Sequence, residues 1–257
     1  GLAGKWVPDI SQDAEGNLWF CSGDFATKGK GVTRYDGHTF TVFDEKDGLL
    51  YPNTMVAFHD KGNTLWLSGQ RGLTRYDGQT FATLDFPGLP MRAGPWVTQD
   101  LEGDIWANTF GYGVVRYDGQ SSKFYTIEDG LANNTVMDVF ADREGFIWMG
   151  ASTGVLSKYD DETFVTITQE DGLASNAVSA MIQDRNGDLW FCTQGGGVTR
   201  YDGETFTTYT EEDGLANNVV PVVVQDRTGN LWFGGNPRRS REVVSPTGSM
   251  LSSGSLT

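Results

Sequence analysis

Apolar and polar residues alternate in short runs along the chain, and the runs return at a nearly fixed distance. Within residues 172–213, four such runs are separated by turn-forming residues: 177–183, 188–193, 198–201 and 205–210. The last run, Thr-Phe-Thr-Thr-Tyr-Thr, alternates with the two-residue period of a β-strand. No run shows the longer period of an amphipathic helix. The pattern predicts four short antiparallel strands in a segment of about 42 residues.

Three sequence markers recur in one order with this period. The first is a Trp with an Asp six residues before it, the second is a Tyr-Asp pair followed in most copies by Gly, and the third is Gly-Leu, usually after Asp. The tryptophans are Trp19, Trp66, Trp106, Trp148, Trp190 and Trp232, with steps of 47, 40, 42, 42 and 42 residues. A period of about 40–45 residues indicates an array of similar supersecondary units.

Four antiparallel strands per repeat are typical of one blade of a β-propeller. We therefore predict an all-β chain with about six visible four-stranded blades, either complete or a fragment of a seven-bladed propeller. The propeller is expected to occupy residues 1–236, with blades starting near residues 4, 53, 94, 134, 176 and 218. The last blade has sequence for its first two strands only.

The two ends of the chain depart from the repeat. Residues 237–257 are rich in Ser, Gly and Arg and contain no aromatic residue, so we expect a flexible or foreign tail. Gly1-Leu2 lies 11 residues before the marker Asp13, the same spacing that separates the other Gly-Leu pairs from the next marker Asp. We therefore expect the chain to begin inside a repeat.

The markers have structural roles that follow from their chemistry. The Trp is expected to fill the space between neighbouring sheets, and the Asp six residues earlier to accept backbone N–H bonds in the first hairpin. The Asp-Gly pair predicts a second hairpin with positive φ at both central residues. Asp184 to Asp188 resembles part of a calcium loop, but its spacing does not fit an EF-hand. A plain turn is the better interpretation.

The net charge of −15 argues against a nucleic-acid partner, because phosphate binding needs a basic patch. Cys21 and Cys192 occupy equivalent positions in distant repeats, which disfavours a disulfide and predicts two small buried side chains. The sequence has no apolar run long enough to cross a membrane and no signal peptide.

The repeat resembles a known family. Asp-Arg-x-Gly-Asn-Leu-Trp-Phe-Gly, Gly-Gly-Gly-Val-Thr-Arg-Tyr-Asp-Gly-x-Thr-Phe-Thr and Glu-Asp-Gly-Leu-Ala-Asn-Asn are similar to the two-component regulator propeller repeat, over residues 1 to about 235. In that family the repeats form the extracytoplasmic sensor of bacterial hybrid histidine kinases, beside a second propeller and a β-sandwich, and many members respond to glycan fragments. The resemblance implies a sensor or binding module in the periplasm or outside the cell, with a neighbouring propeller or sandwich domain as partner.

Candidates for catalysis are few. The chain has two histidines, His38 and His59, and neither has a nucleophile or metal ligand at a suggestive spacing. Streptogramin lyases are also propellers and depend on a catalytic His and a metal, but no matching motif is present. We predict no catalytic residue, no metal site and no cofactor, and we keep a polysaccharide or streptogramin-type lyase as the least favoured alternative.

Binding is indicated by irregularity. The loops between the second and third strands and the connections from one blade to the next share one end of the propeller, and there repeats 1 to 3 depart from the regular repeats 4 to 6. Exposed aromatic rings beside Lys and Arg suit stacking on a sugar and pairing with a uronic acid or sulfate. The alternatives are drift in surface loops or contact with a neighbour, as in a protein-interaction scaffold. The predicted ligand-binding residues are Lys28, Lys30, Tyr51, Arg92, Trp96, Phe110 and Tyr112.

Overall fold

The computed structural model describes residues 1–23, 29–69, 72–84, 93–109, 111–174 and 177–235. The chain divides into two compact units, Gly1–Phe124 and Tyr125–Thr257, and each unit is treated by itself. Lys28, Arg92, Phe110 and the predicted tail at 237–257 lie outside the described residues.

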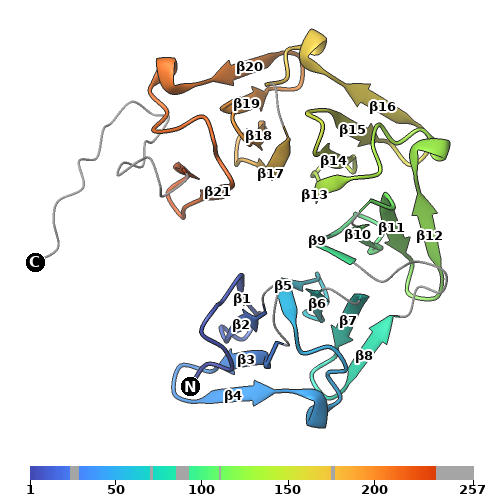
Figure 1. Ribbon diagram of the computed structural model, residues 1–257, viewed down its shortest axis with the longest axis vertical. Helices are drawn as coiled ribbons and strands as arrows, with labels where there is room; N and C mark the ends of the chain where they lie inside the picture. Colours follow the sequence, from blue (N-terminus) through green and yellow to red (C-terminus); the bar gives the residue numbers. More distant parts are fainter. Residues whose placement is uncertain (24–28, 70–71, 85–92, 110, 175–176, 236–257) are drawn as a thin grey trace, which may run out of the picture. The chain divides into compact units, whose positions relative to one another are not determined.

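The first unit holds three four-stranded antiparallel sheets in which strands adjacent in sequence are adjacent in space (Figure 1). The first sheet is β1 (Ile10–Gln12), β2 (Leu18–Ser22), β3 (Gly31–Tyr35) and β4 (Phe40–Phe43). The second is β5 (Thr54–His59), β6 (Leu65–Gly69), β7 (Gly72–Tyr76) and β8 (Phe81–Leu84). The third is β9 (Ala93–Gln99), β10 (Ile105–Thr109), β11 (Val114–Tyr117) and β12 (Ser122–Tyr125), and the unit boundary falls inside β12.

The second unit contains sheets with the same order of strands. One sheet is β13 (Val136–Ala141), β14 (Ile147–Ala151), β15 (Leu156–Tyr159) and β16 (Phe164–Ile167). The next is β17 (Val178–Gln183), β18 (Leu189–Thr193), β19 (Val198–Tyr201) and β20 (Phe206–Tyr209). The last has two strands, β21 (Val222–Gln225) and β22 (Leu231–Gly234).

These sheets confirm the predicted all-β fold of propeller-type blades. Among the described residues, five sheets have four strands and the sixth has two, as the loss of the repeat pattern near the C-terminus predicts. Because the strands of each sheet are antiparallel and follow one another in sequence, the connections between them lie alternately at the two ends of the sheet. We name the end with the β1–β2 and β3–β4 turns, and their equivalents, the turn end. The opposite end, with the β2–β3 loop and the connection to the next sheet, is the loop end.

The Asp-Gly-Leu marker forms a short helix that strand-based prediction missed. The 3-10 turns are η1 (Glu45–Asp47), η2 (Ile127–Asp129), η3 (Gln169–Asp171) and η4 (Glu211–Asp213), each with a capping box and a left-handed Gly at its C-cap. The Leu that follows the Gly is buried in three of the four cases, at Leu49, Leu131 and Leu173. None of the helices in the described ranges has the length or apolar run needed to span a bilayer.

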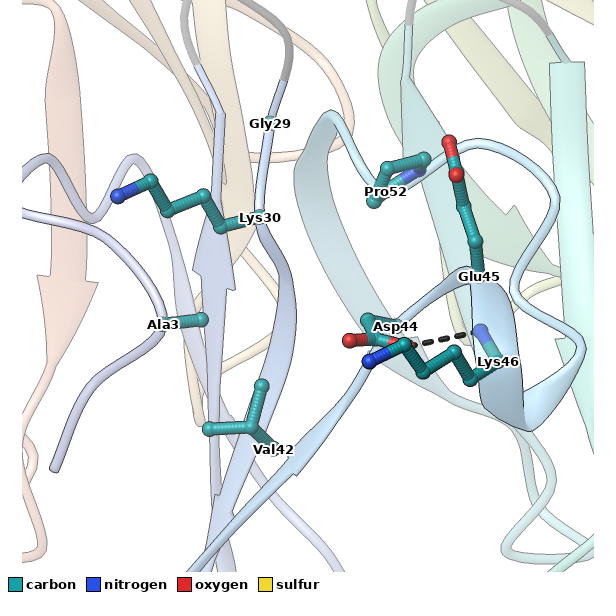
Figure 2. A pocket seen from close by; sticks show the side chains of 8 residues that line it. All are labelled: Ala3, Gly29, Lys30, Val42, Asp44, Glu45, Lys46 and Pro52. Carbon is teal, nitrogen blue, oxygen red and sulfur yellow. Dashed lines mark hydrogen bonds between the residues drawn. The ribbon is translucent and has the colours of Figure 1, made fainter.

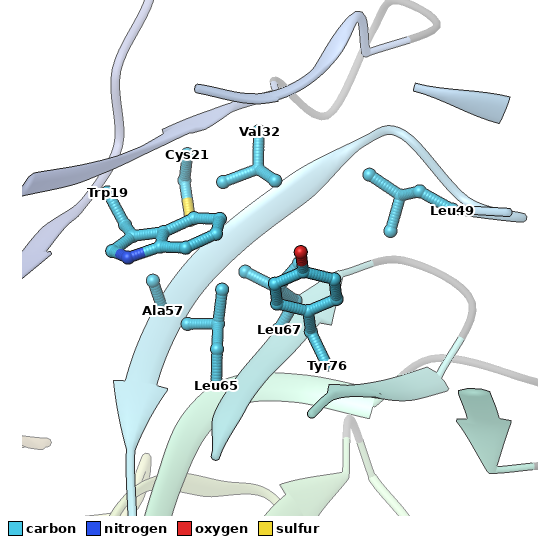
Figure 3. Packing of buried hydrophobic residues seen from close by; sticks show 8 residues of the cluster. All are labelled: Trp19, Cys21, Val32, Leu49, Ala57, Leu65, Leu67 and Tyr76. Carbon is cyan, nitrogen blue, oxygen red and sulfur yellow. The ribbon is translucent and has the colours of Figure 1, made fainter. Parts of the chain in front are cut away.

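Neighbouring sheets pack through the marker Trp. Between the first two sheets, Trp19 lies in a cluster with Cys21, Val32 and Leu49 from one side and Leu67 and other residues from the next sheet (Figure 3). The Trp19 ring lies 5.7 Å from the ring of Tyr76 in the second sheet. The same pairing of a Trp with the Tyr of the following sheet recurs at 6.1 Å for Trp66–Tyr117 and 5.9 Å for Trp148–Tyr201. The Trp therefore fills the inter-sheet space as predicted.

The marker Asp has a second role that the sequence did not reveal. One carboxylate oxygen accepts backbone N–H bonds from the turn, as predicted; in the fourth repeat Asp142 Oδ1 accepts from Phe146 at 2.8 Å. The other oxygen accepts the indole N–H of the Trp six residues later, at 2.7–3.0 Å in all six repeats. One carboxylate thus fixes both the turn and the ring, which explains the constant spacing.

The prediction for the second hairpin was wrong in one detail. In the first repeat the backbone N–H of Asp36 donates to the carbonyl of Thr39, so the central residues are Gly37 and His38. Only the first of them has positive φ, +94° at Gly37, which is the requirement of a type II′ turn. Asp36 lies before the turn and accepts the backbone N–H groups of His38 and Thr39. These bonds lower the pKa of Asp36 to about 2.

Candidate functional site

The loop end of the first unit contains a hollow of about 430 Å³, which we call the loop-end hollow (Figure 2). Its wall comes from the N-terminal segment, the start of β3, the strand β4, the turn η1 and the connection to β5. The lining residues are Ala3, Gly29, Lys30, Val42, Asp44, Glu45, Lys46 and Pro52.

Glycines allow the backbone segments around this hollow to approach closely. Gly31 has a φ of +106°, and a Cβ added there would collide with the carbonyl of Phe43. A Cβ on Gly29 would collide with the backbone of Pro52 and Asn53. Residues 29–31 therefore lie against the β4–β5 connection, where the backbone N–H of Gly31 donates to the carbonyl of Pro52 at 2.9 Å, and the side chain of Lys30 leaves the backbone at this junction.

The charged residues of the loop-end hollow differ in whether their side chains are hydrogen-bonded within the protein or exposed to solvent. Asp44 caps η1, and its Oδ1 accepts the backbone N–H of Lys46 at 2.7 Å (Figure 2). The side chains of Lys30 and Lys46 are exposed. Lys46 stands where the other 3-10 turns have Glu128, Glu170 and Glu212, so repeat 1 reverses the charge at this position. This reversal is visible in the sequence, but it lies inside the Asp-Gly-Leu marker, whose spacing is regular.

The structure places one of the seven predicted ligand-binding residues, Lys30, in the lining of this hollow. Tyr51 is half-buried next to Pro52 and is not part of the lining. Trp96 is half-buried on β9, where its backbone N–H donates to Asn108 Oδ1 at 3.0 Å. Tyr112 follows β10 in the third sheet and is 40% exposed. Tyr112 occupies the repeat position of Lys30, because each precedes the glycine that begins or leads into the third strand.

The sequence analysis missed two carboxylates that bond to the next sheet: the half-buried Asp9, just before β1, and the buried Asp138 on β13. Asp9 Oδ2 accepts the backbone N–H of Ala57 in the next sheet at 2.9 Å, and Asp138 accepts that of Met181. Burial raises the pKa of both, well above the usual value for Asp138. Both stand four residues before a marker Asp, where the other repeats carry an apolar residue. Their bonds link adjacent sheets within each unit.

The cysteines and histidines provide no catalytic arrangement in the described part of the chain. Cys21 and Cys192 are free and buried, as predicted, and burial raises the pKa of both thiols. His59 is half-buried with Nδ1 3.2 Å from Ser11 Oγ, and burial lowers its pKa. His38 lies in the exposed β3–β4 turn. In the residues that the structure describes, no cluster of three or more His, Cys, Asp or Glu could hold a metal ion.

Sequential four-stranded sheets with a repeated Asp–Trp contact define a propeller-type repeat protein. The model of the two component regulator propeller family matches residues 130–153, 172–195 and 214–236. The chain therefore carries repeats of the two component regulator propeller family at these residues, which confirms the resemblance there. No curated protein matches the chain.

Solved structures share the fold at low sequence identity. One is assigned as the extracellular domain of a hybrid two component system of B. thetaiotaomicron, with 19% identity, a TM-score of 0.58 and coverage of 91% of this chain and 38% of that one. PorZ, a surface component of the type-IX secretion system of Porphyromonas gingivalis, has 14% identity, a TM-score of 0.71 and coverage of 98% and 42%. This chain thus spans less than half the length of either. Virginiamycin B lyase from Staphylococcus aureus has 12% identity, a TM-score of 0.73 and coverage of 94% and 81%.

Proposed function

We propose that this chain is a non-enzymatic ligand-sensing module of a two-component-type regulator and that it binds an acidic carbohydrate at the loop-end hollow. The observation that carries the proposal is the pair of exposed lysines, Lys30 and Lys46, beside a hollow of about 430 Å³ in a chain of net charge −15. The match to two component regulator propeller repeats supports the sensor class.

The lining sets two lysines against two acids, Asp44 and Glu45, so it suits a ligand that presents an anionic group to the lysines and an apolar face to the rest. Asp44 directs an oxygen to the backbone of η1, which leaves less of its charge available to repel an anion. Val42 and Pro52 supply apolar surface for a sugar ring, while the two ammonium groups suit a uronic carboxylate or a sulfate. In the third sheet, Tyr112 offers an exposed ring at the repeat position of Lys30.

Isothermal titration calorimetry with a uronate trisaccharide, a sulfated disaccharide and maltotriose tests the ligand class. We expect heat with at least one acidic sugar, weakening by about tenfold or more in Lys46→Glu, which restores the residue type of the other repeats. Lys30→Ala should also weaken binding. Lys123→Glu, with the same charge change on β12 and outside the lining, is the matched control.

Two results would contradict this proposal. One is the absence of heat with every sugar of the panel, and the other is an acidic-sugar affinity that Lys46→Glu leaves unchanged. Tyr112→Ala and Trp96→Ala then ask whether the third sheet contributes to the same ligand. Turnover of any sugar in these solutions would revive the lyase alternative; we expect none, because the described lining has no histidine, cysteine or serine beside its carboxylates.

The proposed setting is extracytoplasmic, beside a neighbouring propeller or sandwich domain of a longer chain. It rests on the similarity to an extracellular domain that is more than twice as long as this chain. A fusion of the full natural protein to alkaline phosphatase, which is active only after export, tests this. Phosphatase activity is expected, and a fusion that is expressed without activity would refute the setting.

A further inference from the structure

The turn end of the first unit contains a second hollow, of about 350 Å³, between the first and second sheets. We call it the turn-end hollow. It lies at the opposite end of these sheets from the loop-end hollow and shares no lining residue with it. Its charged and titratable lining residues are Asp13, Glu15, Arg34, His59, Tyr76 and Asp77.

Arg34 lacks a carboxylate partner that its counterparts in the third and fifth sheets have. In the third and fifth sheets the Nε–H of the equivalent Arg donates to a carboxylate across the strand pair, from Arg116 to Asp104 at 2.6 Å and from Arg200 to Asp188 at 2.7 Å. The acidic residue stands four positions after the marker Asp. In the first repeat that position is Asn17.

Asn17 does not replace the missing carboxylate. Its side-chain N–H donates to Asp13 Oδ2 at 2.9 Å, and its backbone N–H donates to Asp13 Oδ1 at 2.8 Å. The Nε of Arg34 is buried and has no hydrogen-bond partner among the described residues. A buried donor without a partner is unfavourable, so a ligand acceptor that reaches the guanidinium of Arg34 gains a hydrogen bond that this repeat does not supply.

The remaining charges of the turn-end hollow are negative. Hydrogen bonds from backbone N–H groups of the β7–β8 turn lower the pKa of Asp77. Burial alone would raise the pKa of Asp13, but hydrogen bonds from Trp19 and Asn17 outweigh it and lower this pKa. Both carboxylates are therefore ionised at neutral pH. Glu15 lies beside them, with Oε2 2.9 Å from Asn63 Nδ2. Burial lowers the pKa of His59, which leaves it neutral there. With one cation and three acids, a simple anion would be repelled.

We propose that the turn-end hollow binds a small zwitterion of the α-amino acid type, with its carboxylate on Arg34 and its ammonium group toward Glu15 and Asp77. Such a ligand supplies the acceptor that repeat 1 lacks without adding net negative charge. The volume of about 350 Å³ suits an amino acid or a dipeptide rather than a longer chain. This inference does not rest on the carbohydrate proposal.

Equilibrium dialysis of the intact chain against a pool of the common L-amino acids and Gly-Gly, in a phosphate buffer, identifies a binder. Titration then compares that compound with its N-acetyl and amide derivatives, which lack the ammonium group and the carboxylate charge respectively. We expect each derivative to bind at least about tenfold more weakly than the parent.

The decisive variant is Asn17→Asp, which supplies the carboxylate that the third and fifth repeats have at this position. It should pair with Arg34, raise the melting temperature without ligand and weaken zwitterion binding by at least about tenfold. Gln79→Glu adds the same charge at the exposed turn next to Asp77, and should leave binding within about threefold. The absence of any binder in the wild-type chain, or binding that survives Asn17→Asp, would overturn the proposal.

Discussion

Replacing Asp142 by Asn perturbs the contact that recurs in every repeat, the bond between the marker carboxylate and the indole of the marker Trp. Asp142 is 5% exposed and Trp148 is 1% exposed. One oxygen of Asp142 accepts the indole N–H at 2.7 Å, and the other accepts the backbone N–H groups of Phe146 at 2.8 Å and Glu144 at 3.1 Å. Asparagine is nearly the same size but has a single acceptor oxygen.

In the Asp142→Asn variant, one buried donor must face the side-chain amide nitrogen. If the oxygen stays on the turn, the indole N–H loses its partner; if the amide flips, the turn loses two bonds. A bond to a charged group is worth about 1.5–3 kcal/mol and a stranded buried donor costs a similar amount. We expect Asp142→Asn to lower the free energy of unfolding by about 2–4 kcal/mol.

Urea unfolding followed by far-ultraviolet circular dichroism measures this loss. Trp148→Phe removes the indole donor, so adding Asp142→Asn to it should cost less than the same change in the wild-type chain, with a coupling of about 0.5–3 kcal/mol. Asp160→Asn is the matched control, because its exposed carboxylate serves an open turn and should lose less. A loss below about 1 kcal/mol for Asp142→Asn, or no coupling to Trp148, would refute this account of the repeat spacing.

Three further changes probe other parts of the fold. Burial raises the folded-state pKa of Asp138, so its contribution to stability is full below the unfolded value of 3.8 and is lost as the pH rises through the folded pKa. The urea midpoint of Asp138→Asn, relative to that of the wild type, should therefore rise from acidic to neutral pH. A difference in midpoint that does not change with pH would contradict this. Gly197→Ala, at φ +87° and against a backbone carbonyl, should lower the melting temperature more than Gly203→Ala, at φ +100° in open space; equal effects would mean that φ alone decides. Cys21 and Cys192 should react with a thiol reagent only in denaturant, and rapid reaction in buffer would contradict their burial.

The repeat architecture could be predicted because every level of the sequence carries it. Alternating strands, turn residues and the Trp spacing all agree, and the shortened last sheet follows from the point where the pattern stops. The turn role of the marker Asp was also predictable from its chemistry. Its bond to the indole was not recognised, although a constant distance of six residues between Asp and Trp is the signal of such a contact.

The candidate sites were less predictable because they depend on which segments approach one another. Lys30 was predicted as an irregular loop residue and lines the loop-end hollow, but Lys46 belongs to a regular marker and differs only in charge. The unpaired Arg34 becomes visible when Asn17 is compared with Asp104 and Asp188. That comparison has meaning only once the strand register shows that Trp19, two residues after Asn17, lies opposite Arg34. Periodicity alone does not contain this register.

The ring contact between sheets has a consequence for how such chains change over evolutionary time. Within the units, the marker Trp of one sheet contacts the Tyr of the next sheet, as Trp19 contacts Tyr76, Trp66 contacts Tyr117 and Trp148 contacts Tyr201. A repeat that is duplicated or deleted therefore adds or removes both a Trp and a Tyr, the two residues that make the contact between sheets. Gene segments of this length can be gained or lost without redesigning the neighbours, while surface residues in any single copy remain free to acquire a new specificity.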